Sequence, residues 1–346
     1  MFLAKTCAIP GALPGRSPGV PRTLPGCYPV ATVSAKADLA FGPGQYAELA
    51  AQAARDARAP ATWAAYKSTW RSFVTFCEAA GIEAAPSAQA ACAYALHLAE
   101  LGRASSTIDR AMTALGQVAR ARGLEPPTAD SRVAEVLAGL RRRIGTRPAR
   151  KAALTPRQVR DMLEGLPAGK RGLRDRCMLL LGFAGAFRRS ELVAVDVEHL
   201  QWCDEGVRVL VPRSKTDQTG EGMTKAIPPG RSEQTCPVRS LRAWLEASSI
   251  ESGPVFRHVA AGDRVTGRRI GDRQVARLVQ SAAKRAGIEA DLAAHSLRAG
   301  LITAAAKAGR SDWSIMRQSG HASPATLAAY VREARLFDDN AAEGLL

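Results

Sequence analysis

The spacing of apolar residues predicts that the segment from about residue 46 to 146 is helical. Trp63, Tyr66, Trp70, Phe73 and Cys77 recur at steps of three and four residues, which places them on one face of a helix. A stripe of this kind buries a helix against a core, and it does not indicate a cofactor site.

Further helices in this segment are indicated by their start signals. Ser87 precedes an Ala-rich apolar run, and Ser106 with Asp109 has the spacing of a capping box. A last helix, 130–143, ends in three consecutive arginines. These are either charges that favour a helix C-terminus or a phosphate-contacting edge beside the linker that follows, and the sequence leaves both readings open. Four or five helices form an all-α module.

The pattern becomes mixed after the linker. Thr155 and Pro156 suit the N-cap and first position of a helix, and the apolar stretch 177–187 predicts a buried helix. Alternating Val207, Val209 and Val211 predict a strand, which a second strand around 226–227 can pair with across a polar turn. More helices are expected at 237–248, 272–286, 293–308, 312–319 and 323–333. The expected fold is therefore mainly α with a small antiparallel β-sheet.

These patterns divide the chain into four parts. Residues 1–45 are rich in Pro and Gly and lack apolar periodicity, so we expect a disordered leader. An all-α domain at 46–146 is followed by an α+β domain at 147–333. The tail, 334–346, has apolar ends that suit docking on a neighbouring copy, and a frayed terminus fits its sequence equally well.

Charge points to a polyanionic partner. Lys and Arg number 48 against 32 Asp and Glu, a formal net charge of +16, and most of the surplus lies after residue 146. A basic surface alone does not show whether the protein binds nucleic acid or only has a solvated basic face.

Cysteine usage and hydropathy bear on the compartment. The seven cysteines are odd in number, scattered and free of C-x-x-C pairs, which argues against disulfides and zinc. No apolar run approaches the ~18 residues of a membrane span, and prolines interrupt the N-terminus before any signal-peptide core. We expect a soluble, cytoplasmic protein without a membrane partner.

Residues in the C-terminal domain match the needs of phosphodiester transesterification. That reaction requires a nucleophile, cations for the non-bridging oxygens and an acid for the leaving oxygen. Each candidate alone is unremarkable, although Tyr330 is the only tyrosine after Tyr94. The candidates, in chain order, are Arg188, Lys215, His295, Arg298, His321 and Tyr330, with Glu191 in a supporting place.

The order and local contexts of these residues resemble the catalytic set of the tyrosine recombinases, or phage-type integrases. The resemblance covers about 60–335 and includes His-Ser-Leu-Arg-Ala-Gly at 295–300, as in Cre-like members, and Xer-like spacing from Arg298 to His321 and Tyr330. Gly185-Ala-Phe-Arg188-Arg-Ser-Glu191-Leu192 carries Ala186 and Phe187 where the family has Gly and Leu. Ala299 stands where many relatives have a histidine.

The resemblance implies an all-α, SAM-like core-binding domain and an α+β catalytic domain that together grip double-stranded DNA. It implies that Tyr330 attacks the scissile phosphate to form a 3′-phosphotyrosyl bond. The arginines and histidines hold the phosphate, Lys215 protonates the 5′-oxygen and Glu191 orients the site. No metal or cofactor is implied, and the expected assembly is a homodimer on one site and a homotetramer in the synapse.

Two rival functions fit the same residues. A type IB topoisomerase-like enzyme shares the chemistry but nicks and closes DNA as a monomer. A non-catalytic DNA-binding protein on the same fold would not need all six positions filled. The sequence does not identify the DNA site or the direction of recombination.

Overall fold

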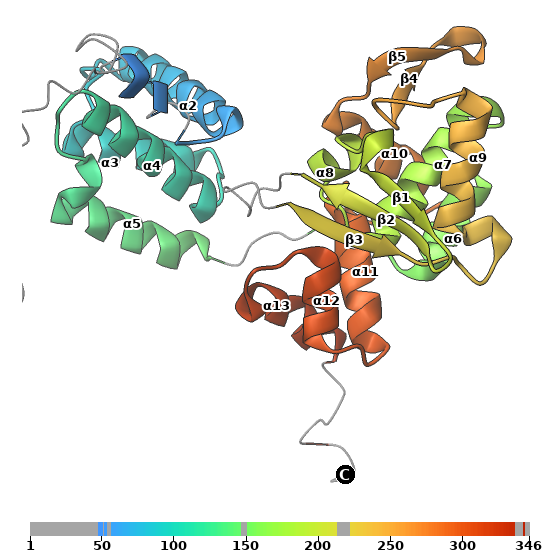
Figure 1. The fold of residues 1–346 in the computed structure, drawn as a ribbon. Helices are drawn as coiled ribbons and strands as arrows, with labels where there is room; N and C mark the ends of the chain where they lie inside the picture. The colour runs from blue at the N-terminus through green and yellow to red at the C-terminus, as the bar shows by residue number, and fades with distance from the viewer. Residues whose placement is uncertain are drawn as a thin grey trace, which may run out of the picture. The chain divides into compact units, whose positions relative to one another are not determined.

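The chain folds into two compact units in the computed structural model, residues 1–146 and 147–346 (Figure 1). The structure describes residues 48–50, 52–53, 57–146, 151–212, 222–335 and 342. Each unit has its own hydrophobic core. The predicted leader, 1–45, lies outside the described residues, as does nearly all of the predicted tail.

In its described part, the first unit has helices and no strands. Its helices are α2 (Pro60–Ala80), α3 (Ala88–Glu100), α4 (Ser105–Ala121) and α5 (Ser131–Ile144). Phe73 and Cys77 of the predicted stripe are fully buried, and the ring of Phe73 meets that of Tyr94 edge to face at 5.3 Å. Ser87 caps α3 by accepting from the backbone N–H of Ala90, as its position predicts.

The predicted capping box at Ser106 is wrong. Helix α4 begins at Ser105, and its N-cap is Ala104, two residues before Ser106, with no side-chain hydrogen bond at the cap. The buried hydroxyl of Ser105 instead donates to the carbonyl of Gly145 after α5. A tertiary contact thus fixes where the helix starts.

Two of the three arginines at the end of α5 pair with acids of the same unit. Arg141 lies 2.7 Å from Asp109, and Arg143 lies 3.0 Å from Glu100. All four side chains are largely exposed, so each pair stabilises the unit by about 0–1 kcal/mol. These charges hold α5 to its neighbours only weakly and remain accessible to solvent.

The second unit contains most of the predicted helices at nearly the expected places. The buried helix expected at 177–187 begins earlier, at Gly169, because polar residues form its first two turns. The unit's helices are α6 (Pro156–Glu164), α7 (Gly169–Ala184), α8 (Arg189–Val193), α9 (Pro237–Ser248), α10 (Asp272–Arg285), α11 (His295–Lys307), α12 (Asp312–Ser319) and α13 (Pro324–Ala334).

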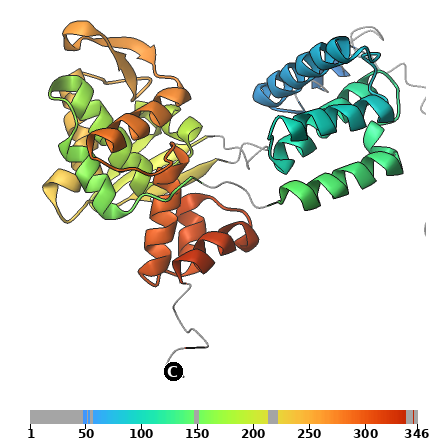
Figure 2. The ribbon, with the colours of Figure 1, turned by 180° about the vertical axis from the view of Figure 1, so that it is seen from behind.

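The predicted strand pair belongs to a three-stranded antiparallel sheet of β1 (Leu200–Cys203), β2 (Gly206–Val211) and β3 (Met223–Ile227). Val207, Val209 and Val211 all point inward. A separate hairpin of β4 (Arg257–Val259) and β5 (Val265–Arg269) was not predicted. It lies at the end of the unit opposite α12 and α13 (Figures 1 and 2). The mainly α fold with small antiparallel sheets is confirmed.

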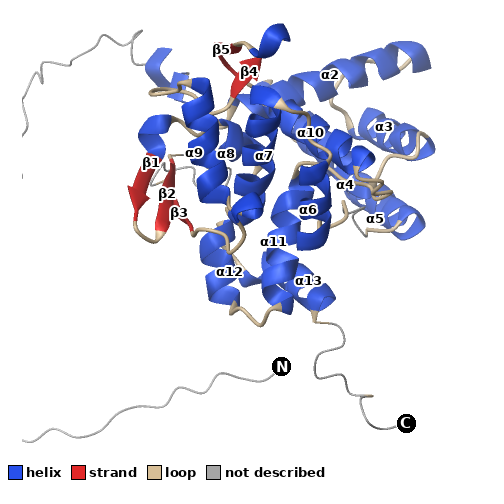
Figure 3. Ribbon diagram, turned by 90° about the vertical axis from the view of Figure 1, so that its right-hand side faces the viewer, coloured by secondary structure: helices blue, strands red, loops and turns tan. Residues whose placement is uncertain are grey.

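Helix α7 is the centre of the second unit. It contacts α6, α9, α10 and α11, while the three-stranded sheet lies to one side of these helices (Figure 3). Its apolar residues from Cys177 to Leu181 are all buried. Trp244 of α9 is fully buried, and its indole N–H donates to the carbonyl of Val255 at 2.8 Å. The C-terminal end of α7 is therefore held firmly in place.

A smaller core joins α11, α12 and α13. Ile302, Ala306, Ile315 and Leu327 are buried together, and Tyr330 packs against them. This cluster places the tyrosine helix against the helix that begins at His295. Among the residues that the structure describes, no helix is both long and apolar enough to span a bilayer.

Ala186, just after α7, has a left-handed backbone conformation with φ +46°. A Cβ in this region is strained by about 1–2 kcal/mol relative to glycine. The conformation is held because the Ala186 carbonyl accepts from Arg298 at 2.8 Å. The family that the sequence resembles has a glycine at this place, and the positive φ gives the physical reason for that glycine.

Replacing Ala186 with glycine should therefore stabilise the protein. Relief of strain outweighs the extra freedom of the unfolded chain, so we expect a gain of about 0.5–1 kcal/mol in the free energy of unfolding. Urea unfolding monitored by tryptophan fluorescence measures it. Ala184→Gly, in the last turn of α7 at ordinary helical angles, is the matched control and should destabilise. A loss of stability in Ala186→Gly would contradict the strain argument.

Candidate active site

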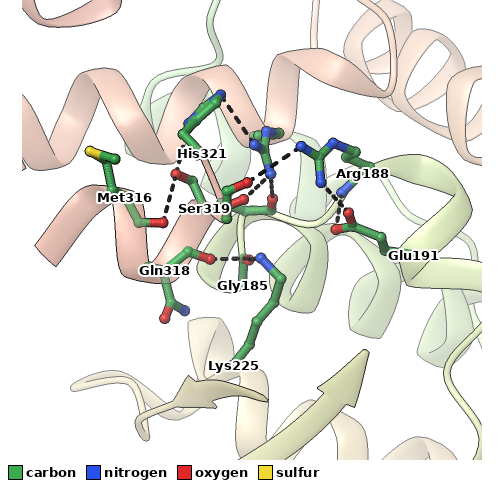
Figure 4. Close-up of polar contacts among 11 residues, drawn as sticks. Gly185, Arg188, Glu191, Lys225, Met316, Gln318, Ser319 and His321 are labelled. Atoms are coloured by element: carbon green, nitrogen blue, oxygen red, sulfur yellow. Dashed lines mark hydrogen bonds and ion pairs between the residues drawn. The ribbon is translucent and has the colours of Figure 1, made fainter. Parts of the chain in front are cut away.

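Five of the six residues predicted to carry chemistry converge at one place in the second unit. They come from the loop after α7, the start of α11, the loop after α12 and the middle of α13. Figure 4 shows part of this cluster, with Arg188 and His321 on either side of the backbone of Ser319.

Arg188 is oriented by Glu191. The guanidinium Nη1 lies 2.5 Å from Glu191 Oε1, and the backbone N–H of Arg188 donates to the other carboxylate oxygen at 3.0 Å. The carboxylate is only 3% exposed, and the arginine side chain is 19% exposed. A buried carboxylate bound at both oxygens fixes the arginine's direction.

Arg298 is almost completely buried, with 1% of its surface exposed. Its Nη1 donates to the carbonyls of Ala186 and Ser319, and its Nη2 lies 3.1 Å from His321 Nε2. Burial and then Arg188 lower the pKa of Arg298 to about 10, while Glu191 opposes them. The guanidinium therefore remains charged at neutral pH.

Gly300 allows the start of α11 to lie close to the chain before α6. A Cβ at this position would stand 2.2 Å from the carbonyl oxygen of Leu154. The backbone N–H of Leu154 in turn donates to the carbonyl of Ser296. The glycine of the His-Ser-x-Arg-x-Gly segment thus has a packing role that sets where Arg298 stands.

The contacts of His321 fix its tautomer. Arginine can only donate, so His321 Nε2 must accept from Arg298, and the ring proton then lies on Nδ1, which donates to Ser319 Oγ at 2.8 Å. Burial, then the cations Arg298 and Arg188, and then the basic groups of His295 and Lys225 lower the pKa of His321 to about 4. The imidazole is therefore neutral at physiological pH.

His295 and Tyr330 form a hydrogen-bonded pair. The imidazole Nε2 lies 2.9 Å from the phenol oxygen. Desolvation, then Arg298 and Arg188, lower the pKa of His295, which favours the neutral ring. A neutral imidazole at this distance can accept the phenol proton, which is what a phenol needs before it can attack at neutral pH.

Lys215, the predicted proton donor, lies outside the described residues, between β2 and β3. The structure instead places another lysine beside the cluster, which the sequence reasoning missed. Lys225 occupies an inward position of β3, opposite Val209, and is 1% exposed. Met223, Lys225 and Ile227 share one face by strand alternation, so a lysine among inward residues was the signal that could have revealed it.

The Lys225 ammonium is held by backbone carbonyls. It donates to Gly185 at 2.9 Å and to Gln318 at 2.6 Å (Figure 4). It also stands 5.1 Å from the centre of the Phe187 ring. Burial lowers the pKa of Lys225 to about 7; Glu191 raises it, whereas Arg298 and Arg188 lower it.

The cations lie where two helices end. Helices α7 and α12 finish close together, and side-chain donors bridge their carbonyls. Lys225 and Arg298 each make two of these hydrogen bonds. In addition, the side-chain amide of Gln318 donates to the carbonyl of Ala184 at 2.8 Å, and Arg188 donates to the carbonyl of Gly320 at 3.5 Å. We call this set the carbonyl seam; it comprises the carbonyls of Ala184, Gly185, Ala186, Gln318, Ser319 and Gly320.

The arrangement has an excess of positive charge. The cations are Arg188, Arg298 and the partly protonated Lys225. One carboxylate, Glu191, and the negative ends of two helices oppose them. Within the described residues, neither arginine Nε donates to a protein group. The cluster can therefore take an anion beside a phenol that already has a proton acceptor.

Comparison with known proteins agrees with this geometry. Residues 152–335 match the model of the phage integrase family. The chain is 33% identical over 290 residues to an integrase/recombinase XerD homolog of Selenomonas ruminantium, which covers 82% of this chain and 85% of that protein. It is 31% identical over 159 residues to the tyrosine recombinase XerC of Corynebacterium glutamicum, covering 46% of each.

Among solved structures, the fold is similar to that of a lambda integrase dimer bound to a COC′ core site. The TM-score is 0.55 at 17% identity, and the match covers 83% of this chain and 75% of that one. The family match and the XerD homolog show the family, and this likeness shows that the fold is shared. The chain belongs to the phage integrase family and is a tyrosine site-specific recombinase.

Proposed function

We propose that this recombinase cuts double-stranded DNA with Tyr330 as nucleophile and rejoins it through a 3′-phosphotyrosyl intermediate. The observation that carries the proposal is the 2.9 Å contact between His295 Nε2 and the Tyr330 hydroxyl, beside two fixed arginines. A nucleophile, a proton acceptor and an anion site lie within one cluster.

Arg188 and Arg298 neutralise the two non-bridging oxygens of the scissile phosphate. Both guanidiniums are held by protein acceptors before DNA arrives, so little reorganisation accompanies the build-up of charge in the transition state. His321 adds a neutral imidazole whose Nε2 already meets Arg298. Glu191 keeps Arg188 in place rather than contacting DNA.

One residue accepts the proton that the nucleophile loses, and another donates a proton to the leaving oxygen. His295 takes the phenol proton as the Tyr330 oxygen bonds to phosphorus, and the bond from phosphorus to the 5′-oxygen breaks. Lys215 gives a proton to that oxygen. An incoming 5′-hydroxyl reverses these steps. The phosphoester bond to Tyr330 has replaced the phosphoester bond to the 5′-oxygen, so no energy source is needed.

The assembly follows from one nucleophile per chain. The catalytic unit contains a single tyrosine, Tyr330, whereas exchange between two duplexes cuts four strands. We therefore infer a homodimer on each site and a homotetramer in the synapse. A cytoplasmic location is also proposed; the five cysteines in the described part of the chain are all free.

Tyr330→Phe should abolish covalent attachment without weakening duplex binding. The hydroxyl is lost, while the ring still packs against the small core of α11–α13. Incubation with nicked suicide duplexes taken from DNA flanking the gene, followed by denaturing electrophoresis, measures adducts, and a mobility-shift titration measures affinity. Tyr66→Phe, in the first unit, is the control and should form the adduct. An adduct from Tyr330→Phe would show that another residue is the nucleophile.

Sulfate should stabilise the protein by occupying the phosphate position. At ten times its Kd, sulfate adds about 1.4 kcal/mol, a rise in Tm of roughly 3–5 °C for a unit of this size. Differential scanning fluorimetry against chloride at equal ionic strength measures the shift. Sulfate also has a general stabilising effect on proteins. Arg188→Met is the control for it and should show only the part of the Tm shift that this general effect causes. Equal shifts in both proteins would argue against an anion site at Arg188.

Lys215→Ala should slow cleavage by about 100-fold or more, because the leaving oxygen loses its general acid. A substrate with sulfur in place of the bridging 5′-oxygen has a leaving group that needs no proton. We therefore expect this substrate to restore the Lys215→Ala rate to within about tenfold of the wild type, measured under single-turnover conditions. A persistent defect with the sulfur substrate would remove Lys215 from the role of acid.

A further inference from the structure

The carbonyl seam places backbone oxygens of like polarity face to face. The last carbonyls of a helix have no partner within that helix, and they carry the negative end of its dipole. Helices α7 and α12 bring two such ends together, so donors must stand between them. Lys225 stands in the middle, bridging Gly185 and Gln318.

The position of Lys225 is costly for a charged side chain. It is fully buried on the inward face of β3, where Val209 and Ile227 are its strand neighbours. Transfer of an ammonium out of water is unfavourable by several kcal/mol unless partners replace the lost hydration. Two carbonyls and the Phe187 ring are those partners.

The two carbonyls that Lys225 joins are close in sequence to the phosphate-binding groups. Gly185 precedes Arg188 by three residues, and Gln318 precedes His321 by three residues. The ammonium therefore joins the segment that carries Arg188 to the segment that carries His321. Its own strand, β3, follows the segment that contains Lys215.

We propose that Lys225 is a positioning residue that holds the Arg188 and His321 segments at the separation required for cleavage. This inference rests on the proposed roles of Arg188 and His321. The ammonium does not touch the reacting atoms. Its hydrogen bonds go to backbone carbonyls beneath the cluster, which supports positioning rather than proton transfer to the leaving group.

Loss of the bridge should impair the chemical step and spare binding. Lys225→Met keeps the length and apolar stem of the side chain but removes both donors. We expect the single-turnover rate of adduct formation at saturating protein to fall about 100-fold, as expected for displacement of a catalytic group by about 1 Å. Duplex affinity should stay within about threefold, because surface phosphate contacts are unchanged.

Two further variants make the result specific. Lys225→Arg keeps a cation with several donors and should recover the rate to within about tenfold of the wild type. Lys307→Met, at the exposed far end of α11, is the matched control and should be unchanged. Thermal unfolding of each variant establishes that the protein is folded. If Lys225→Met does not fold, Gln318→Met replaces it. The Gln318 side chain donates to the carbonyls of Ala184 and Ala226 beside Lys225. The single-turnover rate of Gln318→Met should fall about tenfold.

The sulfur-leaving-group substrate separates positioning from proton transfer. It should restore Lys215→Ala and leave Lys225→Met slow. Recovery of Lys225→Met on that substrate would make Lys225 the acid and overturn the proposal, as would a wild-type rate in folded Lys225→Met. Failure of the proposed function is distinguishable, because Tyr330→Phe would then still form an adduct whatever the result at position 225.

Discussion

Cations held against the carbonyl ends of two helices are the interaction on which the rest of the site depends. Arg298, Lys225 and Arg188 would repel one another if they were brought together without acceptors. The ends of α7 and α12 provide those acceptors, and Glu191 provides one full negative charge. The helix ends in turn would leave carbonyls unpaired without the cations. Each half of the arrangement requires the other.

This mutual dependence explains the architecture around it. Helix α7 is surrounded by other helices, so its C-terminal end has a fixed place. Helix α12 belongs to the smaller core with α11 and α13, which also fixes Tyr330. The carbonyl seam therefore joins the main core of the unit to the small core that carries Tyr330. The placement of the Tyr330 phenol relative to Arg188 and Arg298 depends on this junction.

The sequence predicted the helices, the paired strands and the family more fully than it predicted the site. Periodicity locates α9, α10 and α12 closely because one face of each is apolar. The β4–β5 hairpin has few apolar residues, and Arg269 anchors it through the carbonyl of Val193 and the carboxylate of Asp196. Such contacts join residues more than 70 positions apart, and local pattern cannot reveal them.

Lys225 and Ser105 illustrate the same limit within the predicted elements. A lysine in a short strand reads as a solvent-exposed residue until the register is known, because a shift of one position reverses its direction. Ser106 suits an N-cap by sequence, yet the N-cap of α4 is Ala104, and the hydroxyl of Ser105 donates to the carbonyl of Gly145, 40 residues away. By contrast, motif order brought Arg188, His295, Arg298, His321 and Tyr330 together without any knowledge of these contacts.

The depressed pKa values of the cluster couple DNA binding to protons. The pKa of Lys225 is about 7 in the folded protein, against 10.5 for an ordinary lysine, so between these values the unfolded chain binds more protons and folding stability rises with pH. On the proposed function, a phosphodiester bound beside Arg188 and Arg298 would add negative charge close to Lys225 and His321 and so raise the pKa of both groups. The protein should therefore take up protons when it captures its substrate, and mildly acidic solution favours the complex over the free enzyme.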